Sequence, residues 1–197
     1  RLRAPGGRVE IGGLRTSGAV ELNIEGRDLS LNFPDGVARV DVSILDLAEV
    51  DVTAGDGGDI AISAQNINLL DGSDICAGIG SDGACGGLTT DFGAVDSQAG
   101  DITLDALGTI TIANPVSDVN NQVNSNAIGN GGDINIQAQS LVVTDGGRIN
   151  ARTFGEGDVG SVNISVLDRV ALQDSDIDSF IRSNVESGAV GNSGGVN

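Results

Sequence analysis

The chain of 197 residues contains no His, Lys, Met, Trp or Tyr, and only four Phe, three Pro and two Cys. The lack of His excludes a Ser-His-Asp triad and His-ligated zinc, and two Cys cannot complete a four-thiolate site. Because aromatic residues are so scarce, a core must be built from Val, Ile and Leu. No apolar run approaches the 18 residues or so that a transmembrane helix needs, so we expect no membrane span.

Positive charge is also scarce. Ten Arg stand against 28 acidic residues, which gives a formal net charge of −18 at pH 7. A chain this acidic repels phosphate backbones and anionic membrane surfaces. The sequence therefore argues against nucleic acid as a partner.

An internal repeat is the strongest signal that is present. Residues 131–152 match residues 57–78 without a gap at half of the 22 positions. Within the repeat, apolar residues such as Ile134 and Ile136 alternate with polar ones, and Gly or Asp-Gly separates the groups. Alternation with period two, interrupted by turn residues, predicts three short strands, each of which buries one face.

A shorter motif, Gly-x-[Val/Ile]-x-[Ile/Leu], extends this pattern along the chain. Successive copies begin 28 to 51 residues apart, which is the length of one supersecondary unit with loops of variable length. The longest interval, residues 7–57, is expected to hold two coils. The five copies begin at Gly7, Gly58, Gly100, Gly132 and Gly160.

Stacked coils explain the self-match better than a β-sandwich does, because equivalent residues then lie one above another at about 4.8 Å. We therefore predict an all-β protein, a right-handed parallel β-helix of roughly six coils. We expect residues 1–197 to form a single segment of it, as a fragment of a longer array of repeats. We expect three apolar columns: Ile60, Ile102, Ile134 and Val162; Leu69, Ile110, Val143 and Leu172; and Ile75, Ile149 and Ile177.

Differences in coil length predict two insertion loops, near residues 76–90 and 115–130. The first accounts for about 14 residues beyond the shortest, 28-residue coil. The second contains the Asn-rich stretch 120–126, which we interpret as a solvated loop rather than a binding site. On that interpretation, Asn120→Asp should cost almost no stability.

Asp59, Asp101 and Asp133 share one position of the repeat. Such carboxylates could bind calcium weakly or act as general acid and base. The alternative is that each Asp accepts hydrogen bonds from backbone amides at a turn. We favour the alternative because catalytic carboxylates gather at one place, whereas these recur with the repeat. We accordingly predict no catalytic residue, no metal site and no cofactor.

Several segments together resemble a known family: Gly-Gly-Asp-Ile-x-Ile, Leu-x-x-x-Asp-Gly-x-x-Ile, residues 152–164 (RTFGEGDVGSVNI) and residues 4–10 (APGGRVE). They resemble the filamentous-haemagglutinin-like exoproteins of two-partner secretion, in the form common in cyanobacteria. The resemblance implies a β-helical passenger exported through an outer-membrane transporter. It also implies an adhesin or matrix component, located outside the cell or on the outer surface of a Gram-negative-type bacterium. The Asn-Pro-Asn-Leu type of motif that marks the family's secretion domain is missing.

The two cysteines flank most of the first insertion, and coils without that insertion have no cysteine. In an exported protein we therefore expect a disulfide between Cys76 and Cys85. A loop ordered in advance loses less entropy on binding, so it is also a candidate contact surface. The candidate contact residues are Gly78, Ile79, Ser81 and Asp82.

Three hypotheses for function follow. The first is an adhesin or matrix component that contacts cell-surface glycans or other matrix proteins. The second is a structural filament that assembles end to end. The third is a polysaccharide-active enzyme, which a deep cleft with convergent carboxylates would favour.

Overall fold

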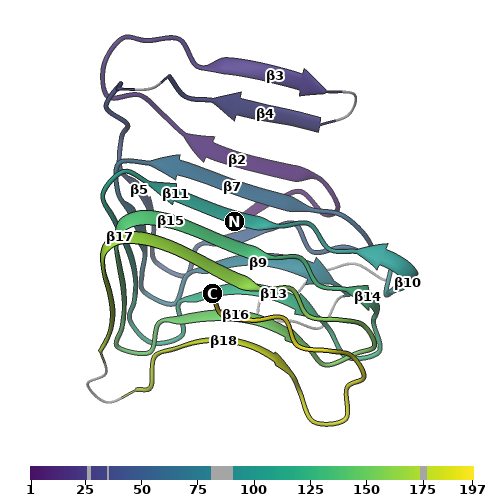
Figure 1. Ribbon diagram of the computed structural model, residues 1–197. Coiled ribbons are helices and arrows are strands. Elements are labelled where there is room, and N and C mark those ends of the chain that lie inside the picture. Colours follow the sequence, from purple (N-terminus) through teal and green to yellow (C-terminus); the bar gives the residue numbers. More distant parts are fainter. Residues whose placement is uncertain (26–27, 35, 81–90, 174–176) are drawn as a thin grey trace.

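The computed structural model describes residues 1–25, 28–34, 36–80, 91–173 and 177–197. Within these ranges the chain forms β-strands and no helix (Figure 1). Almost all strand pairs are parallel, so the protein is all-β with parallel sheets, as predicted. None of the described residues forms a helix with the length and apolarity needed to cross a membrane.

Six strands form the first sheet, sheet A, in the order β1-β6-β9-β13-β16-β18. Every neighbouring pair is parallel. Because parallel neighbours need a long connection, the chain leaves sheet A and returns to it after each strand. The strands are β1 (Leu2–Arg3), β6 (Glu49–Asp51), β9 (Asp74–Ile79), β13 (Asp118–Val123), β16 (Arg148–Thr153) and β18 (Phe180–Val185).

The second sheet, sheet B, has the order β2-β7-β11-β15-β12-β8-β5, and β17 also pairs with β15. The first half of β15 pairs with β11 and its second half with β12, so the sheet bends along one long strand. The strands are β2 (Arg8–Gly12), β5 (Val42–Ile44), β7 (Asp59–Ala64), β8 (Ile67–Leu69), β11 (Ile102–Ala106), β12 (Thr109–Ala113), β15 (Ile134–Thr144) and β17 (Val162–Gln173).

A short third sheet lies where the chain returns from sheet A to sheet B. It pairs β10 (Gly93–Gln98) with β14 (Ile128–Asn130), and isolated bridges continue it to Glu156 and Val190. One pass through sheet B, sheet A and this return forms a unit that we call a level, and successive levels pair strand on strand. Hydrogen-bonded residues of successive levels are 51, 42, 32, 28 and 34 positions apart.

The first predicted apolar column is confirmed. Ile102 lies in register with Ile60 on one side and with Ile134 on the other, and Ile134 with Val162. All four side chains are at most 1% exposed. Burial of this kind is worth about 1.5 to 3 kcal/mol for each side chain.

The other two columns needed correction. Ile112, not Ile110, lies in register with Leu69 and Val143, and Leu172 completes this column but is 47% exposed. Ile181, not Ile177, continues the column of Ile149. The bend between β11 and β12 contains one residue more than its neighbours, which shifts the register of the following strand.

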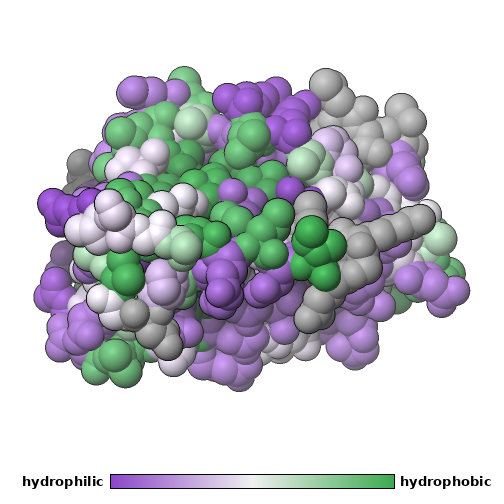
Figure 2. Space-filling model, turned by 90° about the horizontal axis from the view of Figure 1, so that it is seen from above, coloured by the Kyte–Doolittle hydropathy of each residue, from purple (hydrophilic) through white to green (hydrophobic). Residues whose placement is uncertain are grey.

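The longest interval does not contain two coils. Val9 pairs directly with Ile60, so residues 7–57 make one level with an added hairpin. The hairpin joins β3 (Glu21–Glu25) to β4 (Asp28–Asn32), the antiparallel strands of the molecule's fourth sheet. Figure 2 looks onto this end, where apolar side chains lie among polar ones. Leu22 and Ile24 of β3 are 56% and 66% exposed.

The second predicted insertion is not a solvated loop, although the register shows that this level does have extra residues between Ala113 and Ile128. Residues 118–123 form β13, a central strand of sheet A whose side chains are all buried. The Asn-rich stretch is therefore largely strand and not a solvated loop. Likewise, residues 76–79 of the first insertion belong to β9, and residues 81–90 lie outside the described residues.

The glycine of the repeated motif is required by the close approach of successive levels. A Cβ on Gly132 would lie 2.1 Å from the carbonyl oxygen of Gly100, and a Cβ on Gly160 would lie 2.0 Å from that of Gly132. No larger side chain fits there without moving the backbone. The motif thus marks the point where each level enters sheet B.

Candidate functional site

The shared position of Asp59, Asp101 and Asp133 forms a row that we call the aspartate ladder. The Oδ1 atom of each accepts a backbone N–H from the next level, at 2.9 Å from Asp101, 2.8 Å from Asp133 and 2.7 Å from Ser161. Arg8 Nη1 also donates to Asp59 Oδ2 at 3.1 Å. The carboxylates thus satisfy backbone amides, as the alternative interpretation predicted, and they link the levels.

Burial raises the pKa of Asp101, and the negative charges of Asp133 and Asp59 raise it further, while the N–H of Asp133 opposes the shift. A row of serines links the levels in the opposite direction, from each level back to the one before it. Ser73, Ser117 and Ser179 accept N–H groups from the preceding level, each at 3.1 Å. The levels that contain Asp59 with Ser73, and Asp101 with Ser117, are therefore held by side chains that reach both forward and backward.

The predicted contact loop is corrected in part. Gly78 and Ile79 are buried in β9, so they cannot form a contact surface. Ser81 and Asp82 lie outside the described residues. Cys76 is buried and disulfide-bonded. Its predicted partner, Cys85, lies outside the described residues, so that pairing stays a prediction.

The richest polar cluster lies on the side of sheet A that faces away from the core, which we call the polar face. Along β13, Val119 and Val123 point into the core, whereas Asp118, Asn120 and Gln122 point to the opposite side. Those three polar side chains are only 4%, 2% and 5% exposed. Columns on this face change residue type between levels, as in Glu49, Asp74, Asp118, Arg148 and Phe180.

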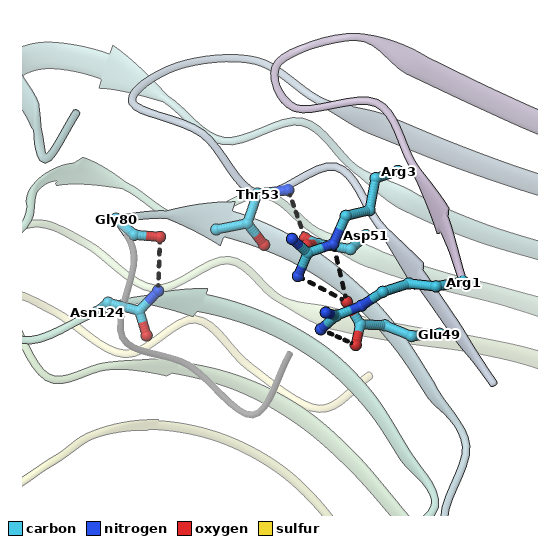
Figure 3. Close-up of polar contacts among 7 residues, drawn as sticks. All are labelled: Arg1, Arg3, Glu49, Asp51, Thr53, Gly80 and Asn124. Carbon is cyan, nitrogen blue, oxygen red and sulfur yellow. Dashed lines mark hydrogen bonds and ion pairs between the residues drawn. The ribbon is translucent and has the colours of Figure 1, made fainter. Parts of the chain in front are cut away.

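The end of the polar face nearest the N-terminus is a paired network (Figure 3). Arg1 Nη2 donates to Glu49, and Arg3 Nη2 lies 3.1 Å from Glu49 Oε1 and 3.3 Å from Asp51 Oδ2. Asp51 is 2% exposed, and its Oδ1 accepts the backbone N–H of Thr53 at 3.0 Å. The charges at this end are therefore balanced within the molecule.

A chain of amides crosses the middle of the polar face. Asn120 Nδ2 donates to Gln122 Oε1 at 3.3 Å, and Gln122 Nε2 donates to Asn124 Oδ1. Asn124 Nδ2 in turn donates to the carbonyl oxygens of Ile79 at 3.0 Å and Gly80 at 3.2 Å; the second bond is drawn in Figure 3. These bonds explain how a strand rich in Asn and Gln can be buried.

The opposite end of the polar face carries Arg148, Arg152 and Arg182, which we call the arginine end. Arg152 Nε donates to Gln122 Oε1 at 2.8 Å, and Arg182 Nε donates to Asn150 Oδ1 at 2.8 Å. Aromatic rings support the guanidinium groups. Arg148 and Arg182 lie 5.3 and 4.7 Å from the centre of the Phe180 ring, and Arg152 lies 4.9 Å from that of Phe154.

Several ionisable side chains on the polar face have pKa values shifted from their ordinary values. Burial raises the pKa of Asp74 to about 7, aided by the negative charges of Asp118 and Glu49. Burial also raises the pKa of Asp118, although the three arginines oppose the shift. Burial lowers the pKa of Arg152, and Arg182 lowers it further. Shifts of this kind often mark functional sites.

Four buried side-chain atoms in the described part of the chain have no hydrogen-bond partner, and all four lie on the polar face. They are Asp118 Oδ1, Asn120 Oδ1, Arg148 Nε and Asn184 Oδ1. Buried polar atoms are nearly always partnered, because an unmade hydrogen bond costs free energy. The polar face is thus the candidate site. Three of these atoms are hydrogen-bond acceptors, and the fourth, Arg148 Nε, is a donor.

The sequence contained a signal for this site that its polar composition obscured. Asp118-Val119 repeats Asp74-Ile75 one level earlier, and both dipeptides align with Arg148-Ile149. That alignment would have placed residues 118–123 in a strand.

Comparison of the chain with family models, with curated proteins and with solved structures found no match in any of the three. The resemblance to two-partner secretion exoproteins consequently rests on the sequence motifs alone.

Proposed function

We propose that this chain is a segment of a right-handed parallel β-helix that works outside the cell as an adhesin or matrix component, and that the arginine end of the polar face, whose side chains are only half-buried, is its contact surface. Export through an outer-membrane transporter is part of the proposal and follows from the motif resemblance. The parallel pairing of successive levels supports the β-helix. The disulfide-bonded Cys76 supports an oxidising compartment such as the cell exterior.

One observation carries the choice of surface: Arg148, Arg152 and Arg182 lie together on β16 and β18 and are half-buried, so that a partner can reach them. The rings of Phe154 and Phe180 support these guanidinium groups. Ordered arginines of this kind can bind acidic groups of a glycan or a protein.

The test is adhesion of the purified chain to cells and to extracellular matrix. Arg148→Gln and Arg182→Gln each remove a half-buried guanidinium group, so they should weaken adhesion and leave the fold intact. Arg169→Gln, which removes the same charge from an exposed position on β17, is the matched control and should adhere like the parent chain. Equal adhesion by all the variants would contradict the assignment of the contact surface.

A second candidate, a polysaccharide-active enzyme, is favoured by Asp74 and Asp118. These residues lie in register on neighbouring strands, and both have raised pKa values, as a general acid requires. Incubation with acidic and neutral polysaccharides, followed by an assay for new chain ends, tests this candidate. If the parent chain forms product and the Asp74→Asn and Asp118→Asn variants do not, the enzyme would be the better proposal and the adhesin would be rejected.

A further inference from the structure

The side of sheet B that faces away from the core has an open groove, which the proposed function does not use. Its volume is about 310 Å³, at the lower end of the range for ligand-binding pockets. The groove crosses β11, β15 and β17, which lie side by side in Figure 1, so its lining residues form rows from level to level. They include Thr103, Asp105, Asn135, Gln137, Asn163 and Ser165.

One row, which we call the asparagine row, is fixed by its own hydrogen bonds. Asn163 Nδ2 donates to Asn135 Oδ1 at 3.0 Å, and Asn197 Nδ2 donates to Asn163 Oδ1 at 2.9 Å. These bonds orient the amides before any ligand arrives, which lowers the entropy cost of binding. An amide has two N–H donors and an oxygen with two acceptor positions, so each asparagine keeps hydrogen-bonding capacity for a ligand.

The second row of the groove has side chains that a ligand can reach. Gln137 lies in register with Asp105 on β11 and with Ser165 on β17. Gln137 and Ser165 are exposed, and neither side chain forms a hydrogen bond with any residue in the described part of the chain. These groups are therefore accessible, unlike the buried unpartnered atoms of the polar face.

The lining of the groove is close to neutral, although the chain has a net charge of −18. Asp105 is the only ionisable side chain among the described residues that line it, and Arg39 Nη1 lies 2.6 Å from Asp105 Oδ2. The aspartate ladder lies beside the groove, since Asp133 is two residues before Asn135, and its charges repel an anionic ligand. A ligand that fits should therefore be uncharged and rich in hydrogen-bonding groups.

We infer that this groove binds a neutral, extended oligosaccharide that runs across the strands and whose hydroxyl groups bond to the asparagine row, Gln137 and Ser165. Hydroxyl groups both donate and accept hydrogen bonds, which matches amide and hydroxyl side chains. Successive levels are about 4.8 Å apart, close to the length of one pyranose unit in an extended β-linked chain, so each sugar meets one level. The groove lies on a different sheet from the arginine end, so this binding goes beyond the proposed function.

Calorimetry of the whole chain with cellohexaose provides the test. The comparison ligands are maltohexaose, which has the same composition but a curved, α-linked chain, and a β-1,4-linked oligoglucuronate, which is extended but anionic. Cellohexaose should bind at least about tenfold more tightly than either, because only an extended neutral chain follows the rows without charge repulsion. This comparison needs no variant, so it does not depend on the folding of a mutant.

Variants then locate the site. Gln137→Ala removes a side chain from the groove and should weaken cellohexaose binding by about threefold to tenfold, as expected for the loss of neutral hydrogen bonds. Gln139→Ala is the matched control, because Gln139 is an exposed residue of the same strand that does not line the groove. Asn163→Ala interrupts the asparagine row and should weaken binding more than Gln137→Ala does. Circular dichroism checks that each variant is folded.

No binding of cellohexaose, or equal affinity for cellohexaose and maltohexaose, would overturn the inference, as would tighter binding of the anionic chain. Equal weakening by Gln137→Ala and Gln139→Ala would also overturn it, since the ligand would then not occupy the groove. Loss of cellohexaose binding in Arg148→Gln would place the ligand at the arginine end and reject the groove. Adhesion through the arginine end is measured separately, so either proposal can fail while the other stands.

Discussion

The aspartate ladder and the polar face both place acidic and amide side chains in rows across successive levels, but they differ in how those side chains are satisfied. Asp59, Asp101 and Asp133 each accept an N–H from the next level. On the polar face, buried oxygens of Asp118 and Asn120 have no partner. The ladder therefore serves the fold by linking the levels, whereas the polar face contains buried atoms whose hydrogen bonds are not made.

The rows also differ in sequence. The ladder keeps the same residue type on three levels, whereas a column of the polar face changes from Asp118 to Arg148 to Phe180. Residue types that every level needs in order to stack recur in successive repeats. On the polar face we therefore look for functional residues at buried polar positions that depart from the repeat, and not at positions that keep it.

The largest effect is expected for Asn120→Asp, which places a second negative charge two residues from Asp118 on the buried polar face. An unpaired buried charge should lower the free energy of unfolding by about 3 kcal/mol or more. This corrects the expectation of almost no cost that followed from a solvated loop. Urea denaturation at neutral pH measures this loss of stability. Asn135→Asp, at a less buried position on sheet B, is the control. Similar denaturation midpoints for the two variants would show that residue 120 is not buried.

Breaking the ladder should have the next largest effect. Asp101→Ala leaves the N–H of Asp133 without its acceptor and should cost about 1 to 3 kcal/mol. Asp101→Asn keeps an acceptor oxygen and removes the repulsion from Asp59 and Asp133, so it should cost less. Thermal denaturation of the two variants compares them. A smaller loss in the alanine variant would mean that the ladder does not link the levels.

Asp74→Asn tests the electrostatics of the polar face through pH. The pKa of Asp74 is raised from 3.8 to about 7 by burial and by the facing charges of Asp118 and Glu49. The unfolded chain therefore releases its proton first, and stability falls as the pH rises from about 4 to about 7, after which the cost is constant. The variant should match the parent chain near pH 3.5.

At pH 8, Asp74→Asn should be more stable than the parent chain by about 1 to 2 kcal/mol, a figure discounted because Asp74 is partly exposed. Asp178→Asn, at an exposed site, is the control and should show no such pH dependence. Guanidinium denaturation at the two pH values provides the measurement. A constant difference across pH would argue against a raised pKa at Asp74.

The smallest loss of stability is expected for Asn120→Ala, and it gives the clearest test of the difference between the aspartate ladder and the polar face. Asn120→Ala removes an oxygen that has no partner and only one long hydrogen bond of 3.3 Å, so stability should change by less than about 1 kcal/mol. Asp133→Ala, which removes a ladder acceptor, should cost more in the same urea titration. If Asn120→Ala cost more stability than Asp133→Ala, the polar face and not the ladder would have the structural role.

Much of the fold could be predicted from the sequence, because alternation of apolar and polar residues shows which side of a strand is buried. The column of Ile60, Ile102 and Ile134 followed directly from the motif glycine beside it. Register was harder to predict. Ile110 and Ile112 both point inward, and period two cannot tell which of them meets Leu69 after a bend of variable length.

The site could not be predicted, because the polar composition of residues 120–126 was taken to mean that these residues are exposed. Asn120, Gln122 and Asn124 are polar residues typical of loops, yet they bond to one another along a buried strand. Exposed Leu22 and Ile24 are the reverse case, since these apolar residues lie on a hairpin that carries them away from the core. The Asn-rich stretch is placed in sheet A by pairing of β13 with β9 and β16, which are distant in the sequence, and a single sequence does not show that pairing.

The two sets of links between levels have a consequence for how such a protein can change over evolutionary time. Asp101 reaches forward to the next level and Ser117 reaches back to the previous one, and neither reaches further. Successive levels stack although their spacing varies from 28 to 51 positions, so extra residues in the connections leave the first apolar column in register. A change in one level therefore leaves the contacts of distant levels intact.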